Sequence, residues 1–145
     1  MEKRNALTLG GEPRLWNGFS RLARLDGNTV IVQTGGGFSP TEVRALDGSV
    51  LWSYRPAGPS QPPPTSMRPA DLDGDGALEF YASTNTGIVR LDGQGREVWS
   101  HKAAVDQIVA VVPRSGSEPG LVVAAGDGRA ILVSEGGSLI GEIKA

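Results

Sequence analysis

The residues of this chain best suited to bind or activate something lie in one short stretch. That stretch is Asp71-Leu-Asp-Gly-Asp-Gly-Ala-Leu-Glu79, with acidic side chains at its positions 1, 3, 5 and 9. Alternate carboxylates in a tight turn suit a hard cation such as Ca²⁺, which takes about six to eight oxygens at roughly 2.3–2.6 Å. We predict a Ca²⁺ site whose ligands are the side chains of Asp71, Asp73, Asp75 and Glu79 and the main-chain carbonyl of Ala77.

The glycines of this loop support the same prediction. Gly74 and Gly76 allow the left-handed backbone that would wrap the loop around an ion. The alternative is a solvated acidic turn, because Asp and Gly are ordinary turn residues. Four spaced acids favour the metal site. Without an ion these carboxylates repel one another, so we expect Ca²⁺ to stabilise the fold.

The flanks of the loop exclude an EF-hand. An EF-hand needs a bidentate Glu at its position 12, inside a helix–loop–helix. Position 12 here is Ala82, and residues Glu79–Thr84 have the aromatic and β-branched composition of a strand. A carboxylate at position 9 between two strands instead resembles the calcium loop of FG-GAP (VCBS-type) β-propeller repeats. The corresponding stretches 24–28 and 114–118 carry fewer acids, so we predict one Ca²⁺ per chain.

Composition limits the classes of function. The chain has 145 residues, enough for one domain, and its 14 basic and 16 acidic residues form no basic field for nucleic acid. Cysteine is absent, which excludes disulfides and thiolate chemistry. No apolar run approaches the roughly 20 residues that span a bilayer. We therefore expect neither nucleic-acid binding nor membrane insertion. No signal-peptide pattern opens the chain, so the compartment stays unknown, although the FG-GAP resemblance implies an extracytoplasmic one.

An internal repeat indicates the architecture. Two alternating strands joined by an Asp-Gly or Gly-Gly turn recur three times, and two further apolar strands precede each hairpin. Four antiparallel strands at a period of about 45 residues are typical of propeller blades. We predict an all-β fold of β-propeller-type repeats, about three four-stranded antiparallel blades plus an N-terminal partial blade. The predicted units are the partial blade 1–18, blade 1 at 19–56, a Pro-rich inter-blade loop at 57–65, blade 2 at 66–104 and blade 3 at 105–145.

Tryptophans mark the outer hairpins. The segments Ala45–Trp52 and Arg90–Trp99 resemble the tryptophan repeat of quinoprotein (PQQ-like) propellers. That resemblance implies that Trp52 and Trp99 stack between neighbouring blades, and Trp16 matches less well. An aromatic ligand platform is the alternative for Trp16. The chain has no cysteine and nothing that matches the quinone site of that family, so we predict no catalytic and no cofactor-binding residues.

Blade number bears on function. A propeller closes with about four to eight blades, so three would leave apolar faces open at both ends. We expect self-association, most simply as a homodimer that completes a ring. The predicted function is a non-catalytic, calcium-stabilised module that binds a protein or a glycan. The alternatives are an enzyme-associated propeller, as a relative of polysaccharide lyases or quinoproteins, and a purely structural fragment of a larger surface protein.

Overall fold

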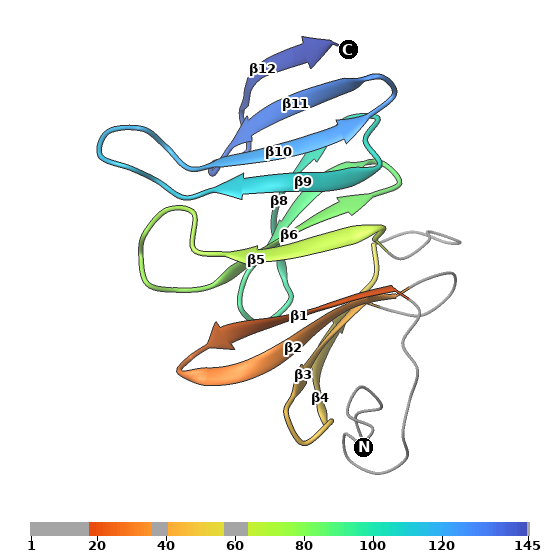
Figure 1. The fold of residues 1–145 in the computed structure, drawn as a ribbon, viewed down its shortest axis with the longest axis vertical. Coiled ribbons are helices and arrows are strands. Elements are labelled where there is room, and N and C mark those ends of the chain that lie inside the picture. The colour runs from red at the N-terminus through yellow and green to blue at the C-terminus, as the bar shows by residue number, and fades with distance from the viewer. Residues whose placement is uncertain (1–17, 36–40, 57–63, 145) are drawn as a thin grey trace, which may run out of the picture.

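Short strands and turns make up the described part of the protein. The computed structural model describes residues 18–35, 41–56 and 64–144 (Figure 1). Within these ranges the chain forms strands and no helix, and hence no helix that could cross a membrane. The predicted partial blade and Trp16 lie outside the described residues, except for Gly18, and so does most of the predicted Pro-rich loop.

The strands form three antiparallel sheets of four strands each. The first sheet contains β1 (Gly18–Leu25), β2 (Asn28–Gly35), β3 (Thr41–Ala45) and β4 (Val50–Tyr54). The second contains β5 (Ser66–Ala70), β6 (Glu79–Thr84), β7 (Gly87–Leu91) and β8 (Glu97–Lys102). The third contains β9 (Gln107–Val112), β10 (Leu121–Gly126), β11 (Arg129–Ser134) and β12 (Leu139–Lys144). Neighbouring strands in the sequence are neighbours in each sheet, as in a series of hairpins.

The three sheets share one register. The central row of the first sheet aligns Val32, Val43 and Trp52 across β2, β3 and β4. The corresponding rows are Tyr81, Arg90 and Trp99 in the second sheet and Val123, Leu132 and Gly141 in the third. In every sheet a shift in register between the third and fourth strands follows this row. The repeat seen in the sequence is therefore also a repeat in three dimensions.

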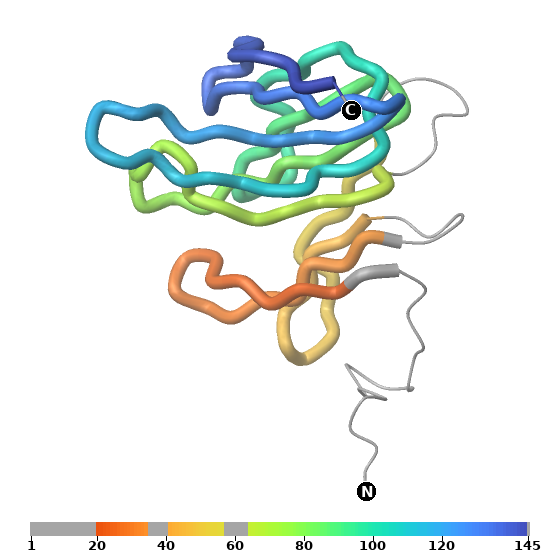
Figure 2. The backbone as a smooth tube through the Cα atoms, turned by 45° about the horizontal axis from the view of Figure 1, so that its top comes forward, coloured from red at the N-terminus to blue at the C-terminus, as the bar shows by residue number. Residues whose placement is uncertain are grey.

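The sheets stack face to face along the long axis of the molecule (Figures 1 and 2). One apolar cluster fills the junction of the first and second sheets, and its largest fully buried member is Phe80. A second cluster fills the junction of the second and third sheets, around Tyr81, Leu72 and Ile88. Because side chains alternate along a strand, Phe80 and Tyr81 enter opposite junctions from adjacent positions. The second sheet is thus apolar on both faces, and β6 is buried along its whole length.

Tryptophan joins each sheet to the next. The indole nitrogen of Trp52 donates a hydrogen bond to the carbonyl of Gly93 in the second sheet, at 3.0 Å. Trp99 likewise donates to the carbonyl of Glu135 in the third sheet, at 2.9 Å. Both acceptors lie in the turn between the third and fourth strands of the receiving sheet. The predicted inter-sheet role of Trp52 and Trp99 is confirmed.

The structure also confirms the all-β class and the three four-stranded antiparallel sheets. The arrangement of these sheets as a propeller, and the unit boundaries, stay predictions. Each end of the stack has one outward face. On the third sheet that face carries Val112, Val123, Leu132 and Ile143, of which Val112 and Ile143 are 45% and 62% exposed.

Candidate metal centre

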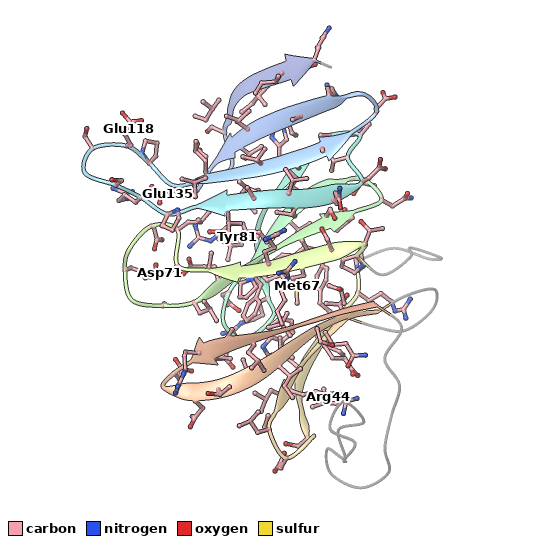
Figure 3. The ribbon with its side chains drawn as sticks, in the orientation of Figure 1. Arg44, Met67, Asp71, Tyr81, Glu118 and Glu135 are labelled. Atoms are coloured by element: carbon pink, nitrogen blue, oxygen red, sulfur yellow. The ribbon has the colours of Figure 1, made fainter. Side chains whose placement is uncertain are left out.

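The acidic loop joins β5 to β6 and brings its four predicted carboxylates together. Asp71, Asp73, Asp75 and Glu79 each place one oxygen within 4.8 Å of the others. Two oxygens bound to one Ca²⁺ lie at most about 5 Å apart, given calcium–oxygen distances of about 2.3–2.6 Å. The cluster therefore has the spacing to hold a metal ion. Figure 3 shows Asp71 in this loop, beside the third sheet.

Hydrogen bonds inside the loop fix its shape. The side chain of Asp71 accepts from the backbone amides of Gly74 at 2.9 Å, Asp75 at 3.2 Å and Gly76 at 3.0 Å. Asp75 in turn accepts from the amide of Ala77 at 2.8 Å. Gly74 and Gly76 have φ values of 74° and 86°, the left-handed conformation that the sequence predicts. The backbone is thus folded around the carboxylates.

Glu79 is the most buried acid of the set. The residue is 4% exposed, and its Oε1 atom is buried without a hydrogen-bond partner among the described residues. Burial, and next the charge of Asp73, raise the pKa of Glu79 from 4.5 to about 7. A buried carboxylate oxygen without a hydrogen-bond partner is unfavourable unless a bound group compensates it. Glu79 is therefore the strongest sign that the cluster is built for a ligand.

An arginine of the second sheet lies against the same cluster. The Arg90 guanidinium donates a hydrogen bond to Oδ2 of Asp73 at 3.2 Å and lies 3.7 Å from Oε2 of Glu79. Burial acts to raise the pKa of Asp73, but hydrogen bonds from the Asp75 amide and from Arg90 outweigh it and hold that pKa below its usual value. Asp73 is thus kept ionised and ready to bind a cation.

The donor set defines the class of metal. All the candidate ligands are oxygens, which suit hard cations such as Ca²⁺, Mg²⁺ or Mn²⁺ rather than metals that prefer thiolate or imidazole. Among these hard cations, the choice of Ca²⁺ stays a prediction. The role of the Ala77 carbonyl as a fifth ligand stays a prediction.

The loop also contacts the third sheet. The Leu72 carbonyl accepts from the Arg114 amide at 2.8 Å. Gly120 packs so closely on Leu72 that a Cβ atom there would lie 2.5 Å from the Leu72 carbonyl oxygen. Arg90 donates to the Glu135 carbonyl at 2.9 Å, and the Glu135 carboxylate pairs with Arg114. The acidic cluster therefore lies at the junction of the second and third sheets (Figure 3).

Sequence reasoning missed two residues of this centre. Arg90 lies in β7 and Glu135 follows β11, so neither is near the acidic loop in sequence. The register of β7 against β6 brings Arg90 beside Tyr81, with its guanidinium carbon 6.0 Å from the centre of the Tyr81 ring. The available signal was the position of an arginine where the other hairpins carry Val43 and Leu132.

The stretch 24–28, aligned in the sequence with the acidic loop, has a different structure. Asp26 and Gly27 form a two-residue hairpin turn, with φ values of 51° and 81°. A turn of two left-handed residues connects the strands directly and leaves no loop that could encircle an ion. The first sheet therefore lacks a counterpart of the acidic loop, whereas the third sheet has a loop of similar length at residues 113–120, which includes the aligned stretch 114–118.

Comparisons with known proteins support the fold. No family model matches the chain, and no curated protein matches it in sequence. The chain is similar to the crystal structure of the V. cholerae biofilm matrix protein Bap1, with a TM-score of 0.65 and 19% identity over 93% of this chain and 21% of that chain. It thus spans about a fifth of the length of that protein. A protein of unknown function from Bacteroides caccae gives a TM-score of 0.49 at 15% identity, covering 85% of this chain and 44% of the other.

Proposed function

We propose that this chain is a non-catalytic β-propeller-type module that one Ca²⁺ ion stabilises and that binds a protein or a glycan. The observation that carries the proposal is the convergence of four carboxylates, one of them the buried Glu79. The similarity to part of a biofilm matrix protein agrees with a role in an extracellular assembly. Millimolar Ca²⁺ outside the cell would suit an exposed loop of modest affinity.

Bound Ca²⁺ would strengthen the junction between the second and third sheets. It would neutralise the loop that presents the Leu72 carbonyl to Arg114, and would give the buried Oε1 atom of Glu79, which has no hydrogen-bond partner among the described residues, a ligand. A ligand that binds only the folded protein adds about 2.7 kcal/mol of stability at a free concentration a hundred times its Kd. The ion is thus proposed as a structural one, which carries out no chemistry on a substrate.

The proposal includes self-association as a homodimer. The outward face of the third sheet presents apolar side chains with no charge among them, including the exposed Val112 and Ile143. Apolar patches of this kind on a soluble module are typical of interaction sites. On the first sheet the outward face is more polar, and carries the ion pair of Arg44 with Glu42 at 2.7 Å. The third sheet is therefore the more favourable surface for a partner.

Thermal melting with light scattering, in Ca²⁺ and then in EGTA, tests both parts of the proposal. We expect EGTA to lower the melting temperature of the wild-type protein by several degrees. Asp73→Asn should remove most of this difference, whereas Asp127→Asn, which changes an acid in the β10–β11 turn, should keep it. A melting temperature that is the same in Ca²⁺ and EGTA would contradict the metal site.

Light scattering addresses the dimer separately. The wild-type protein should have the mass of two chains at micromolar concentration. Ile143→Glu introduces a charge into the outward face of the third sheet and should give a monomer. Val98→Glu is the matched control, because Val98 is 53% exposed on β8 of the second sheet, which lies between the other two and has no outward end face. A wild-type monomer, or equal behaviour of the two variants, would contradict self-association through this face.

A further inference from the structure

The contacts of Arg90 give this residue a place in the metal centre. Its guanidinium lies against two of the proposed ligands, Asp73 and Glu79, at 3.2 and 3.7 Å. Its side chain is 14% exposed, so solvent screens these contacts only weakly. The positive charge of Arg90 thus lies next to the same carboxylates that would bind a cation.

The repeat shows that this arginine belongs to the acidic loop rather than to the fold. The same row of the register holds Val43 in the first sheet and Leu132 in the third, each between the corresponding residues of the flanking strands. Val43 is fully buried at the first junction without a charge, and Leu132 is an apolar residue of the outward face of the third sheet. Burying a guanidinium here is costly unless carboxylates compensate it. Arg90 therefore occurs in the one described sheet whose loop supplies four acids.

A second contact holds the guanidinium in place. Arg90 also donates to the Glu135 carbonyl at 2.9 Å, on the third sheet, and stands 6.0 Å from the Tyr81 ring centre. Because the guanidinium is held by both Asp73 and the Glu135 carbonyl, it cannot move far from the loop when a cation binds. The positive charges of arginine and ion would then be close together in a partly buried site.

We propose that Arg90 is a built-in counter-cation of the acidic loop, which competes with a bound divalent cation for Asp73 and Glu79 and lowers its affinity. This inference rests on the proposed metal site. An ion at about 2.6 Å from Oδ2 of Asp73 lies within about 6 Å of the guanidinium nitrogen, which is 3.2 Å from the same oxygen. Even at the dielectric constant of water, repulsion of a divalent ion at that distance weakens binding about tenfold.

Arg90 has a different effect on the acidic loop with and without a bound divalent cation. Without a divalent cation, Arg90 offsets the mutual repulsion of the carboxylates and keeps the loop folded. With the cation bound, the guanidinium is a like charge beside it. Both effects reduce the gain from binding, so Arg90 would confine occupancy to surroundings rich in Ca²⁺.

Isothermal titration with Ca²⁺ on Arg90→Met tests the proposal. Methionine keeps much of the side-chain volume and removes the charge, and the Glu135 carbonyl keeps its hydrogen bond from Trp99. We expect Ca²⁺ to bind about tenfold more tightly or better. Arg44→Met is the matched control, since Arg44 is also poorly exposed and ion-paired, but lies on the first sheet. Its affinity for Ca²⁺ should equal that of the wild type.

A trivalent ion separates electrostatic repulsion from a change in loop shape. Repulsion scales with the charge of the ion, so Tb³⁺ should gain about thirtyfold from Arg90→Met where Ca²⁺ gains about tenfold. Tb³⁺ luminescence, excited through the nearby Tyr81 and Trp99, measures this affinity directly. Arg90→Gln removes the charge but keeps a donor, and serves as the second variant if Arg90→Met does not fold.

The outcomes are distinct. If the wild type binds Ca²⁺ and the neutral variants bind it equally or less tightly, Arg90 is no competitor and the inference is overturned, while the metal site stands. Equal gains for Ca²⁺ and Tb³⁺ would also overturn it, because repulsion predicts unequal ones. If neither the wild type nor the neutral variants bind either ion, the metal site and this inference fail together. Binding only after the arginine is neutralised would support the inference.

Discussion

The two junctions between the sheets share one mechanism of attachment, and the second adds a partly buried cluster of opposite charges to it. In both, an apolar cluster is closed by an indole that donates to a turn carbonyl of the next sheet. The first junction then uses aromatic packing, with Trp52 edge-on to Phe80 at 5.0 Å between ring centres. The second places Arg90, Glu79 and the acidic loop beside the indole of Trp99.

This difference separates the interactions that stack the sheets from those whose strength should depend on a cation and on pH. Apolar burial with a tryptophan bridge is present at both junctions, so it is the attachment that they share. The partly buried ion pairs of Arg90 with Asp73 and Glu79 lie at the second junction, and these groups depend on one another for compensation. Dependence on a cation and on pH should therefore be confined to that junction, while losses of packing should affect both.

The largest expected effect tests the shared mechanism. Gly95 and Gly137 lie under the rings of Trp52 and Trp99, with φ values of 82° and 94°. A Cβ atom would lie 2.5 Å from the Trp52 ring in one case and 2.9 Å from the Trp99 ring in the other. Gly95→Ala and Gly137→Ala should each lower the free energy of unfolding by about 3–5 kcal/mol, through backbone strain and displacement of the indole. Urea denaturation followed by tryptophan fluorescence measures both.

Gly128→Ala controls for the backbone term in that experiment. Gly128 has a φ of 73° in the β10–β11 turn, and a Cβ atom there would meet nothing within 4 Å. Gly128→Ala should lower the free energy of unfolding by about 1–2 kcal/mol, from the left-handed conformation alone. If Gly95→Ala lowered the free energy of unfolding no more than Gly128→Ala does, the close contact with the indole would not hold the first junction together.

The pH dependence should distinguish the second junction. In EGTA, the stability of the wild type should fall by about 1–3 kcal/mol as pH rises from about 4.5 to about 7. The reason is that the pKa of Glu79 is raised to about 7 by burial, so the folded state binds this proton more tightly than the unfolded chain. Its contribution is complete below 4.5 and is lost as pH rises through 7. Saturating Ca²⁺, which keeps the carboxylate ionised, should abolish the fall.

Glu79→Gln supplies the control for this pH profile. The neutral amide cannot titrate, so the variant in EGTA should lack the part of the slope that Glu79 causes. Urea midpoints between pH 4.5 and 8 in EGTA measure the difference between the two proteins. Parallel profiles for Glu79→Gln and the wild type would show that the slope arises elsewhere.

Much of the fold was predictable because its signals are local. Turns such as Asp26-Gly27 and Asp92-Gly93 interrupt alternating apolar strands, and such turns specify hairpins without help from the rest of the chain. The acidic loop was predictable for the same reason, since Asp71 to Glu79 is continuous in sequence. Its glycines adopt the left-handed backbone that the spacing predicted.

The rest depended on contacts between sheets. Arg90 joins the acidic loop only through the pairing of β7 with β6, and Glu135 only through the stacking of the third sheet on the second. The stretch 24–28 was likened to the acidic loop by composition, although its hairpin register leaves just two turn residues. Residue types showed which groups could bind a cation, and tertiary packing determined which other charge lies beside them.

The smallest expected effect contrasts two buried tyrosines. The Tyr54 hydroxyl donates to Oε2 of Glu97 across the first junction at 2.7 Å, whereas the Tyr81 hydroxyl at the second is buried without a partner among the described residues. Tyr54→Phe should cost about 1 kcal/mol of unfolding free energy, for the loss of a charged hydrogen bond. Tyr81→Phe should instead gain up to about 1 kcal/mol, because it removes an unsatisfied buried hydroxyl. Urea denaturation of both variants measures these opposite changes. If Tyr81→Phe lost as much unfolding free energy as Tyr54→Phe, the Tyr81 hydroxyl would have a hydrogen-bond partner, as the Tyr54 hydroxyl does.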